Sequence, residues 1–238
     1  MGQAITKAAA EDDSLQIVAG FDIAENNSLS YPVYTNQNDF TGEADVMIDF
    51  SHPSCLDDCL AFCKERALPI IVATTGLTEE QKEKLASYSR TIPVFFSANM
   101  SLGVNLITEL AKKAAQILQD SFDIEIIEKH HNQKLDAPSG TALSIADAIK
   151  TALDKEPEYV YERQSVRRKR SKQEIGIHSI RGGNIVGEHS VLFAGNDEVI
   201  EIKHTAQNRA LFANGAIAAA KFMAGKPAGF YTMTDLFN

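Results

Sequence analysis

The first hundred residues alternate short apolar runs with segments of helical spacing. Helical spacing covers 54–66 and 78–89, and the second segment opens with a threonine and two acids, which is typical of a capped helix start. The apolar runs predict strands at 15–21, 45–50, 69–73 and 92–97. Because strands that are apolar throughout must be covered on both faces, we expect an α/β fold with a parallel sheet here.

The second half of the chain has a different pattern. We expect its elements in this order: helix 102–119, strand 122–128, helix 139–153, strands 176–181, 187–195 and 197–206, and an Ala-rich helix at 209–224. Ser139 is the expected N-cap of the second helix. Gly-Gly and Gly-Asn turns between the last three strands favour an antiparallel meander. The final helix is expected to fold back onto the first half.

Composition and charge narrow the class of protein. The chain has 238 residues, 44% hydrophobic and 23% charged, which is typical of a globular protein and too apolar for a disordered one. No apolar run approaches the ~20 residues of a membrane helix, and acids stand where a secretory signal would be apolar. A net charge of -9 disfavours bulk binding to nucleic acid or membrane, and three cysteines make no disulfide framework. We therefore expect a cytoplasmic enzyme or enzyme subunit.

Asp22 follows the first predicted strand, at the position where dinucleotide-binding sheets carry an acid for the ribose hydroxyls. In such sheets a strand and a Gly-rich turn come before this point and hold the pyrophosphate. Here a helix at 2–10 comes first, so we expect the chain to begin partway through the motif. The alternative is that Asp22 is an ordinary turn residue.

The segment 127–143 holds the densest chemistry of the sequence. His130, His131 and Lys134 leave the end of a predicted strand, and a Pro-Ser-Gly-Thr turn then opens a helix. The backbone N–H groups at 139–141 would form an anion site for a carboxylate or phosphate, with Gly140 permitting close approach. The histidines and the lysine would supply protons and positive charge beside it. A surface loop with chance histidines explains the same pattern equally well.

The run at 128–141 resembles the signature E-x-H-H-x-x-K-x-D-x-P-S-G-T of the dihydrodipicolinate reductases, nicotinamide-dependent enzymes of diaminopimelate and lysine biosynthesis. Other segments are similar to that family and occur in its order: 45–53, 72–77, 95–105, 180–189 and 212–216. The resemblance implies NAD(P)H-dependent reduction of 4-hydroxy-tetrahydrodipicolinate, with loss of water before hydride reaches a cyclic imine.

The resemblance also implies roles for single residues. His130 would be the proton donor or acceptor and Lys134 the second proton donor. His131, Gly140 and Thr141 would hold the carboxylates of a cyclic dicarboxylate substrate. NADH or NADPH would contact the following residues: Asp22, Ala73, Thr74, Thr75, Ser97, Ala98, Asn99 and Met100. No metal is expected.

The resemblance implies a Rossmann-type dinucleotide-binding domain at 1–101 and 210–238. It implies an α+β substrate and tetramerisation domain with a mixed or antiparallel sheet at 102–209, and thus a homotetramer. Ile23 stands where some members carry an arginine, which favours NADH over NADPH. Only Met1-Gly2 match the family's Gly-rich loop. A cofactor-deficient remnant that binds a dicarboxylate or regulates is therefore the alternative, and another nicotinamide reductase acting on an anionic ring is a third possibility.

Several other features suggest chemistry but have simpler explanations. Cys55, Cys59 and Cys63 lie four apart on one predicted helix and span about 12 Å, too far for one zinc ion, so we expect packing roles. The basic run 167–172 is expected to be a solvated loop. Arg181 is either a substrate contact or a turn residue. Packing in the core or at an interface is expected for the remaining strand histidines, which are His178, His189 and His204.

Overall fold

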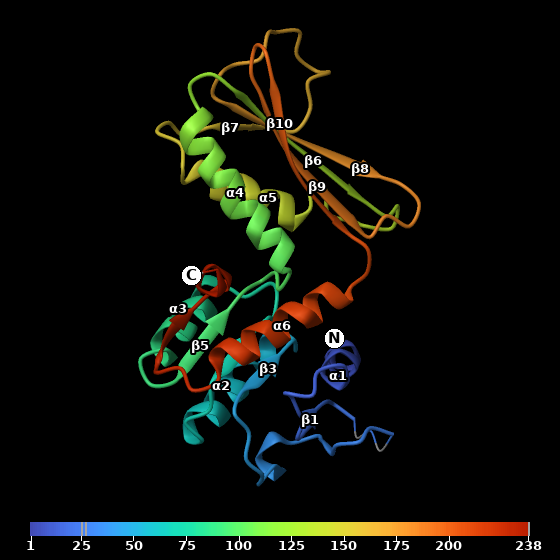
Figure 1. The fold of residues 1–238 in the computed structure, drawn as a ribbon, viewed down its shortest axis with the longest axis vertical. Helices are drawn as coiled ribbons and strands as arrows, with labels where there is room; N and C mark the ends of the chain where they lie inside the picture. Colours follow the sequence, from blue (N-terminus) through green and yellow to red (C-terminus); the bar gives the residue numbers. More distant parts are fainter. Residues whose placement is uncertain (25, 27, 238) are drawn as a thin grey trace. The chain divides into compact units, whose positions relative to one another are not determined.

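The computed structural model describes residues 1–24, 26 and 28–237. The chain forms two compact units, Met1–Leu102 with Ala210–Asn238 (unit 1) and Gly103–Arg209 (unit 2). The expected domain boundaries, 101/102 and 209/210, lie within one residue of this division. Figure 1 labels the elements of each unit. Among the described residues, no helix has both the length and the apolar composition to span a membrane.

Unit 1 is built on a parallel sheet covered on both faces. The strand order is β11 (Gly229–Tyr231), β5 (Pro93–Phe96), β4 (Ile70–Val72), β3 (Met47–Asp49). Side chains of a strand alternate between faces. Ile70 and Val72 therefore pack with helices α2 (Leu56–Glu65) and α3 (Glu79–Tyr88), whereas Ile71 packs with α6 (Ala210–Met223). The continuous apolar runs reflect this double cover, and the expected parallel α/β fold is confirmed.

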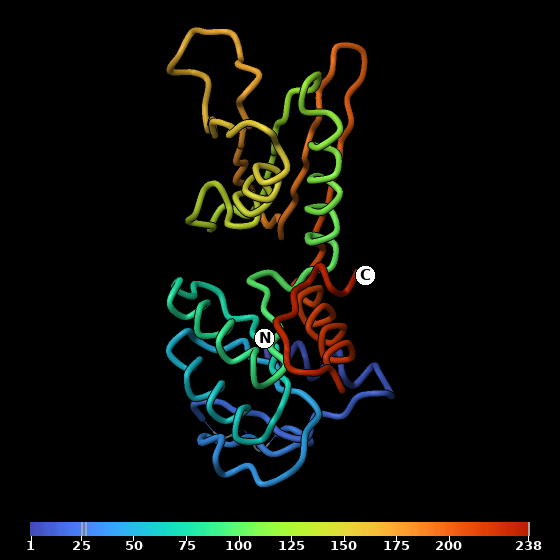
Figure 2. The backbone as a smooth tube through the Cα atoms, turned by 90° about the vertical axis from the view of Figure 1, so that its left-hand side faces the viewer, coloured from blue at the N-terminus to red at the C-terminus, as the bar shows by residue number. Residues whose placement is uncertain are grey.

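Helix α6 returns from the end of the chain to this sheet, as the sequence predicts. Figure 2 shows it, in orange and red, among the blue and green segments of unit 1. Its small residues allow a close approach, because a Cβ at Gly215 would collide with the carbonyl oxygen of Met100. Helix α3 begins with the expected cap: Thr78 Oγ1 accepts from Gln81 N–H at 3.2 Å, and Gln81 Oε1 accepts from Thr78 N–H at 3.0 Å.

The start of unit 1 differs from the prediction. Only Gly20–Phe21 of the expected strand 15–21 is a strand (β1), because its parallel partner β2 (Val33–Tyr34) is equally short and strands form only where backbone groups pair. The other elements of this unit are α1 (Gly2–Ala10) and three 3₁₀ turns, at Gln37–Asp39, Pro53–Cys55 and Met233–Leu236.

Unit 2 contains a five-stranded mixed sheet. The strand order is β10 (Val199–Ala206), β9 (Gly187–Ala194), β6 (Asp123–His130), β8 (Glu174–Arg181), β7 (Glu158–Val160). Strand β6 is antiparallel to β9 and parallel to β8. The expected meander is therefore wrong at one point: β8 and β9 are not neighbours, because β6 pairs with both of them. Turn residues predict where strands end, whereas an earlier strand inserted between two later ones leaves no local signal.

Helices α4 (Leu102–Leu118) and α5 (Gly140–Lys150) cover one face of this sheet. Ile107 and Ala111 of α4 and Ile145 of α5 pack in one core with the inward residues of β6, β8 and β9. Among the described residues of this unit, no helix packs on the opposite face. Ile180 and Val199 are exposed there.

Candidate functional site

The strand register in unit 2 gathers polar residues at one end of its helix-covered face. Along β6, Ile124 and Ile126 are in the core, and Glu128 and His130 continue the same face to the strand end. In β8, Arg181 pairs with His130, and in β9, His189 pairs with Glu128. The sheet thus brings together residues that are about fifty to sixty positions apart in the sequence.

Glu128 is the centre of this cluster. Its carboxylate is fully buried and accepts two parallel bonds from Arg181, at 2.7 and 2.8 Å. It also contacts His130 Nδ1 at 2.6 Å and accepts from Ser139 N–H at 3.1 Å. Burial alone would raise the pKa of Glu128, but these donors outweigh it and lower the pKa to about 2. Glu128 is therefore a fixed anion at neutral pH.

His130 is held in one orientation by that anion. Only 9% of its surface is exposed, and its Nδ1 is engaged by Glu128, so proton exchange falls to Nε2. A Cβ at Gly187 would lie 3.1 Å from Nε2, so a glycine on β9 leaves room for this edge of the ring. The arrangement is a carboxylate–imidazole pair, in which the carboxylate fixes the orientation of the ring.

His189 ties the cluster to the start of α5. Burial, with the charge of His130 adding to it, lowers the pKa of His189 to about 4, so the ring is neutral at neutral pH. His189 Nε2 lies 3.1 Å from Ser139 Oγ, which caps the helix by accepting from Ala142 N–H at 3.2 Å. His189 and the capping hydroxyl of Ser139 therefore share a hydrogen bond whose donor is set by the tautomer of the neutral ring. The expected N-cap, Ser139, is confirmed. His189 is buried, as expected of a packing residue, and it also forms a hydrogen bond with this N-cap.

Lys134 lies beside the exposed first turn of α5. Its ammonium is 2.9 Å from Asp136 Oδ1, and the carboxylate of Asp136 also accepts from Gly140 N–H. Arg181 Nη2 donates to the carbonyl oxygen of Asp136 at 2.6 Å. The anion cradle expected at 139–141 thus has a lysine on one side, and Thr141 is half-buried within it.

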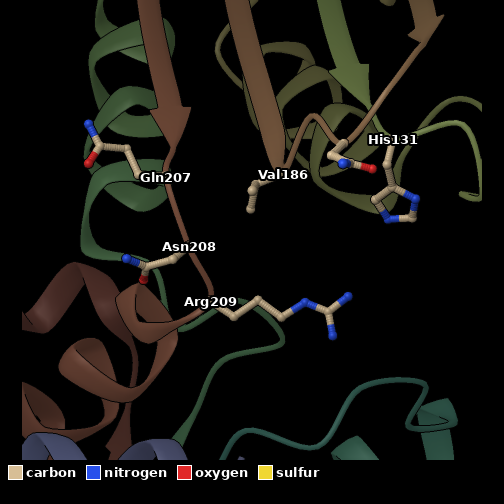
Figure 3. A pocket seen from close by; sticks show the side chains of 6 residues that line it. His131, Val186, Gln207, Asn208 and Arg209 are labelled. Atoms are coloured by element: carbon tan, nitrogen blue, oxygen red, sulfur yellow. The ribbon is translucent and has the colours of Figure 1, made fainter.

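His131 faces a separate hollow in the same unit. Figure 3 shows the side chain of Arg209 extended beneath His131 and Val186. The cavity has a volume of about 300 Å³, and Asn184, Gln207 and Asn208 complete its lining. A guanidinium, an imidazole and three amides are hydrogen-bond donors that suit an anionic ligand.

Sequence reasoning missed Glu128, His189 and Arg209 as members of the site. Glu128 is part of the quoted signature. An acid and a histidine two residues apart lie on the same face of a strand, and this spacing was a usable signal for a pair. The two alternatives for Arg181 both miss its main role, which is to pair with Glu128. Arg209 carries no local signal beyond its place between the last strand of unit 2 and α6.

In unit 1, the expected cofactor residues follow strands of two parallel sheets, β1 of the pair β1–β2 and β4 and β5 of the four-stranded sheet. Asp22 is exposed directly after β1, and its Oδ1 accepts from Ile23 N–H at 2.7 Å. Thr75 is exposed after β4, whereas Ala73 is buried. Thr74 is also buried, and its hydroxyl lies 3.0 Å from both Asp49 Oδ2 and Ser51 O. Of the expected cofactor residues after β1 and β4, Asp22 and Thr75 have exposed side chains.

The turn after β5 is organised by its own polar groups. Ser97 Oγ donates to Asn99 O at 2.7 Å and accepts from Asn99 N–H at 3.2 Å, and Asn99 Oδ1 accepts from Ser101 N–H at 2.9 Å. Ala98 is exposed, and Met100 is buried against α6. Because β4 and β5 are parallel neighbours, Thr75 and this turn lie at the same edge of the sheet, where α/β proteins bind ligands.

The cysteines, the basic run and the strand histidine His178 have mostly the roles that the sequence predicts. Cys59 and Cys63 lie on the buried face of α2, and burial raises the pKa of Cys59 to about 12, which confirms their packing role. The basic run is largely exposed, but Arg170 is a correction: its guanidinium is pinned between Asp123 and Glu125. His178 pairs with Glu125 at 2.7 Å on the face of the sheet away from the helices.

Two family models match consecutive parts of the chain. Residues 1–100 match "Dihydrodipicolinate reductase, N-terminus" and residues 103–237 match "Dihydrodipicolinate reductase, C-terminus". A curated relative in Clostridium novyi (strain NT), called 4-hydroxy-tetrahydrodipicolinate reductase, is 49% identical over 100% of this chain and 94% of its own length. A relative of the same name in Caldanaerobacter subterraneus is 50% identical over 99% of this chain and 93% of its own length.

Solved structures with the same fold extend the comparison. A dipicolinate-bound dihydrodipicolinate reductase from Paenisporosarcina sp. TG-14 has a TM-score of 0.82 at 24% identity, covering 97% of this chain and 92% of that one. An amine dehydrogenase from Mycobacterium smegmatis has a TM-score of 0.64 at 9% identity, covering 97% and 91%. At these identities the structures support the fold alone.

Proposed function

The chain belongs to the dihydrodipicolinate reductase family, and from this premise we propose how its residues carry out the family's reaction. It catalyses the nicotinamide-dependent reduction of 4-hydroxy-tetrahydrodipicolinate, an oxidoreductase step of diaminopimelate and lysine biosynthesis. The roles of single residues, the choice of cofactor and the assembly state are our proposals.

His130 exchanges the proton that accompanies hydride transfer. Its Nδ1 lies 2.6 Å from the buried carboxylate of Glu128, which holds that side of the ring and leaves Nε2 for exchange. Nε2 then carries the proton toward the substrate. The bidentate pair with Arg181 fixes Glu128, so the ring keeps one orientation through the reaction.

Lys134 and the start of α5 bind one carboxylate of the substrate. The N–H groups of Gly140 and Thr141 and the ammonium of Lys134 provide hydrogen bonds and charge for it, and Lys134 is also the second proton donor. His131 and Arg209, which line the same cavity, bind the other carboxylate. Two cationic subsites suit a ring that carries two carboxylates.

The nicotinamide cofactor supplies the hydride when it is bound. The residues of unit 1 fit such a cofactor, since Asp22, Thr75 and the turn at 97–99 lie after parallel strands with polar groups at the surface. Asp22 would accept from the ribose hydroxyls. Its negative charge would repel a 2′-phosphate, and Ile23 beside it offers no positive charge, so we propose NADH as the preferred cofactor. We expect kcat/KM about tenfold higher with NADH than with NADPH; equal values would contradict this preference.

The uncovered face of the unit 2 sheet suits assembly of several copies. Ile180 and Val199 are exposed on it among charged side chains, and apolar residues on an otherwise polar sheet face favour contact with another protein surface. We propose a homotetramer formed through this unit, and light scattering of the full chain measures its mass. We also propose a cytoplasmic location, which suits three free thiols.

The carboxylate–imidazole pair of Glu128 and His130 is the observation that carries the residue assignment, and turnover tests it. We expect His130→Gln and Lys134→Ala each to lower kcat by roughly 10²-fold to 10⁴-fold. Lys134→Ala should also weaken binding of pyridine-2,6-dicarboxylate. His178→Gln, on the other face of the same sheet, is the matched control and should retain turnover. Full turnover in both site variants would overturn the assignment.

A further inference from the structure

The donors assigned above to one substrate carboxylate already hold a carboxylate of this chain. Asp136 Oδ1 lies 2.9 Å from the ammonium of Lys134. Lys134 is the main cause that lowers the pKa of Asp136, and the N–H of Gly140, the first residue of α5, adds to that lowering. Lys134 and Gly140 are two of the groups that the proposed function gives to the substrate.

The position of Asp136 is set by its neighbours rather than by its own burial. Arg181 holds the carbonyl oxygen of Asp136 at 2.6 Å while its guanidinium stays paired with Glu128. The side chain of Asp136 is 56% exposed, and that of Lys134 is 23% exposed. An anchored backbone with an exposed carboxylate lets the side chain leave by rotation about its own bonds, without movement of the helix or of the Glu128 cluster.

From this geometry we propose that Asp136 is an internal competitor for the carboxylate subsite: its carboxylate occupies the cradle of Lys134 and Gly140 and must be displaced by the substrate's carboxylate. Asp136 thereby sets substrate affinity and confines tight binding to anions that outcompete it. This inference rests on the proposed function of the cradle and adds a residue that opposes binding.

The exchange balances in charge and hydrogen bonds. One carboxylate leaves Lys134 and Gly140 and another takes its place, so the donors are never left unpaired. A dicarboxylate gains over Asp136 because its second carboxylate also engages His131 and Arg209, whereas a monocarboxylate has no such second anchor. The same site therefore discriminates against small monocarboxylates.

Calorimetric titration of the full chain with pyridine-2,6-dicarboxylate tests the proposal. Asp136→Asn keeps the shape of the side chain and removes its charge, and Asp136→Ala removes the competitor altogether. We expect the Kd to fall roughly threefold to tenfold in both variants, with the KM for the substrate falling in parallel. Glu156→Gln is the matched control. Glu156 is an exposed acid that pairs with Lys150 beyond the other end of α5, so this substitution removes the same charge away from the cradle.

A second readout separates competition from a general change of charge. In a Lys134→Gln background the cradle has lost the ammonium for which the two carboxylates compete, so Asp136→Asn should tighten binding less than it does beside Lys134. Equal tightening in both backgrounds, or by Glu156→Gln, would overturn the proposal. So would a Kd for Asp136→Asn that is unchanged or higher. If the unsubstituted chain bound no dicarboxylate and reduced no substrate, the proposed function itself would fail.

Discussion

The substrate end of unit 2 and the cofactor edge of unit 1 use different kinds of residues. In unit 2, Glu128, His130 and His189 are buried and hydrogen-bonded to one another or to the helix that follows. In unit 1, Asp22 and Thr75 are exposed and lie in turns just after strands. The first region is a polar network inside a core, and the second is a set of short side chains at the edge of a sheet.

The difference fits the role that we propose for each region. A group that moves a proton needs a fixed orientation and a controlled charge, which burial and hydrogen bonds provide. A surface that binds a long cofactor needs accessible backbone and small polar groups. Substitutions in the network should therefore change stability and turnover together, whereas substitutions at the edge should separate binding from stability.

The largest expected effect comes from Glu128→Gln. The substitution leaves Arg181 near a neutral amide in a buried position, which destabilises the fold by about 3 kcal/mol. It also removes the anion that orients His130, so we expect kcat to fall roughly 10²-fold. Thermal unfolding and steady-state kinetics measure the two effects.

Asp22→Asn is the counterpart in unit 1. Because Asp22 is exposed, the free energy of unfolding should change by less than about 0.5 kcal/mol. The KM for NADH should rise about tenfold, since an amide is a weaker acceptor for ribose hydroxyls than a carboxylate. If Glu128→Gln left stability unchanged, or Asp22→Asn lowered it strongly, the contrast between the two regions would be wrong.

An intermediate effect is expected in acid. The pKa of His189 is lowered to about 4 and that of Glu128 to about 2, so the unfolded chain binds these protons at higher pH than the folded one. Stability is then present above the ordinary pKa values and is lost as pH falls, between about 6.5 and 4 for His189 and between about 4.5 and 2 for Glu128. Each contribution amounts to roughly 3 kcal/mol at most.

Urea unfolding between pH 7 and pH 4 measures the first of these losses. His189→Gln should flatten the dependence in that range, because the titrating group is gone. An unchanged slope in His189→Gln would contradict the assignment of this loss to His189.

The smallest effects separate two adjacent threonines of unit 1. Thr74→Val removes a buried hydroxyl from Asp49 and should lower the free energy of unfolding by about 1–2 kcal/mol. Thr75→Val, at an exposed position, should change it by less than about 0.5 kcal/mol and should raise the KM for NADH a few-fold. Chemical denaturation and kinetics distinguish the two, and equal losses of stability would remove the distinction between buried and exposed positions at this edge.

Much of the fold could be read from the sequence because its signals are local. Strands 69–73 and 92–97 are apolar throughout, which requires cover on both faces, and Thr78 with Gln81 forms the expected helix start. The place of β6 between β8 and β9 could not be read, because strand order depends on contacts between residues far apart in the chain. Strand 15–21 was overestimated because an apolar run forms a strand only where a partner exists.

The candidate site could be read as a list of residues but not as a network. The motif at 128–141 indicated His130, Lys134 and the start of α5. That Glu128 joins Arg181, His130 and Ser139 depends on the register of three strands, which composition does not encode. Asp136 stood in the same motif, yet its competition for the cradle follows only from the distance to Lys134.

Helix α6 has a consequence for how the chain folds. It covers one face of the unit 1 sheet, yet it follows all of unit 2 in the sequence. During synthesis the strands of unit 1 emerge early. The face of the sheet that carries Ile71 and Phe95 stays uncovered until residues 210–223 leave the ribosome. By then unit 2, a continuous segment, is available to fold. Unit 1 depends on contacts between residues more than a hundred positions apart. This dependence slows its folding and exposes it to aggregation. We therefore expect unit 2 to complete its fold before unit 1, although most of unit 1 is synthesised first.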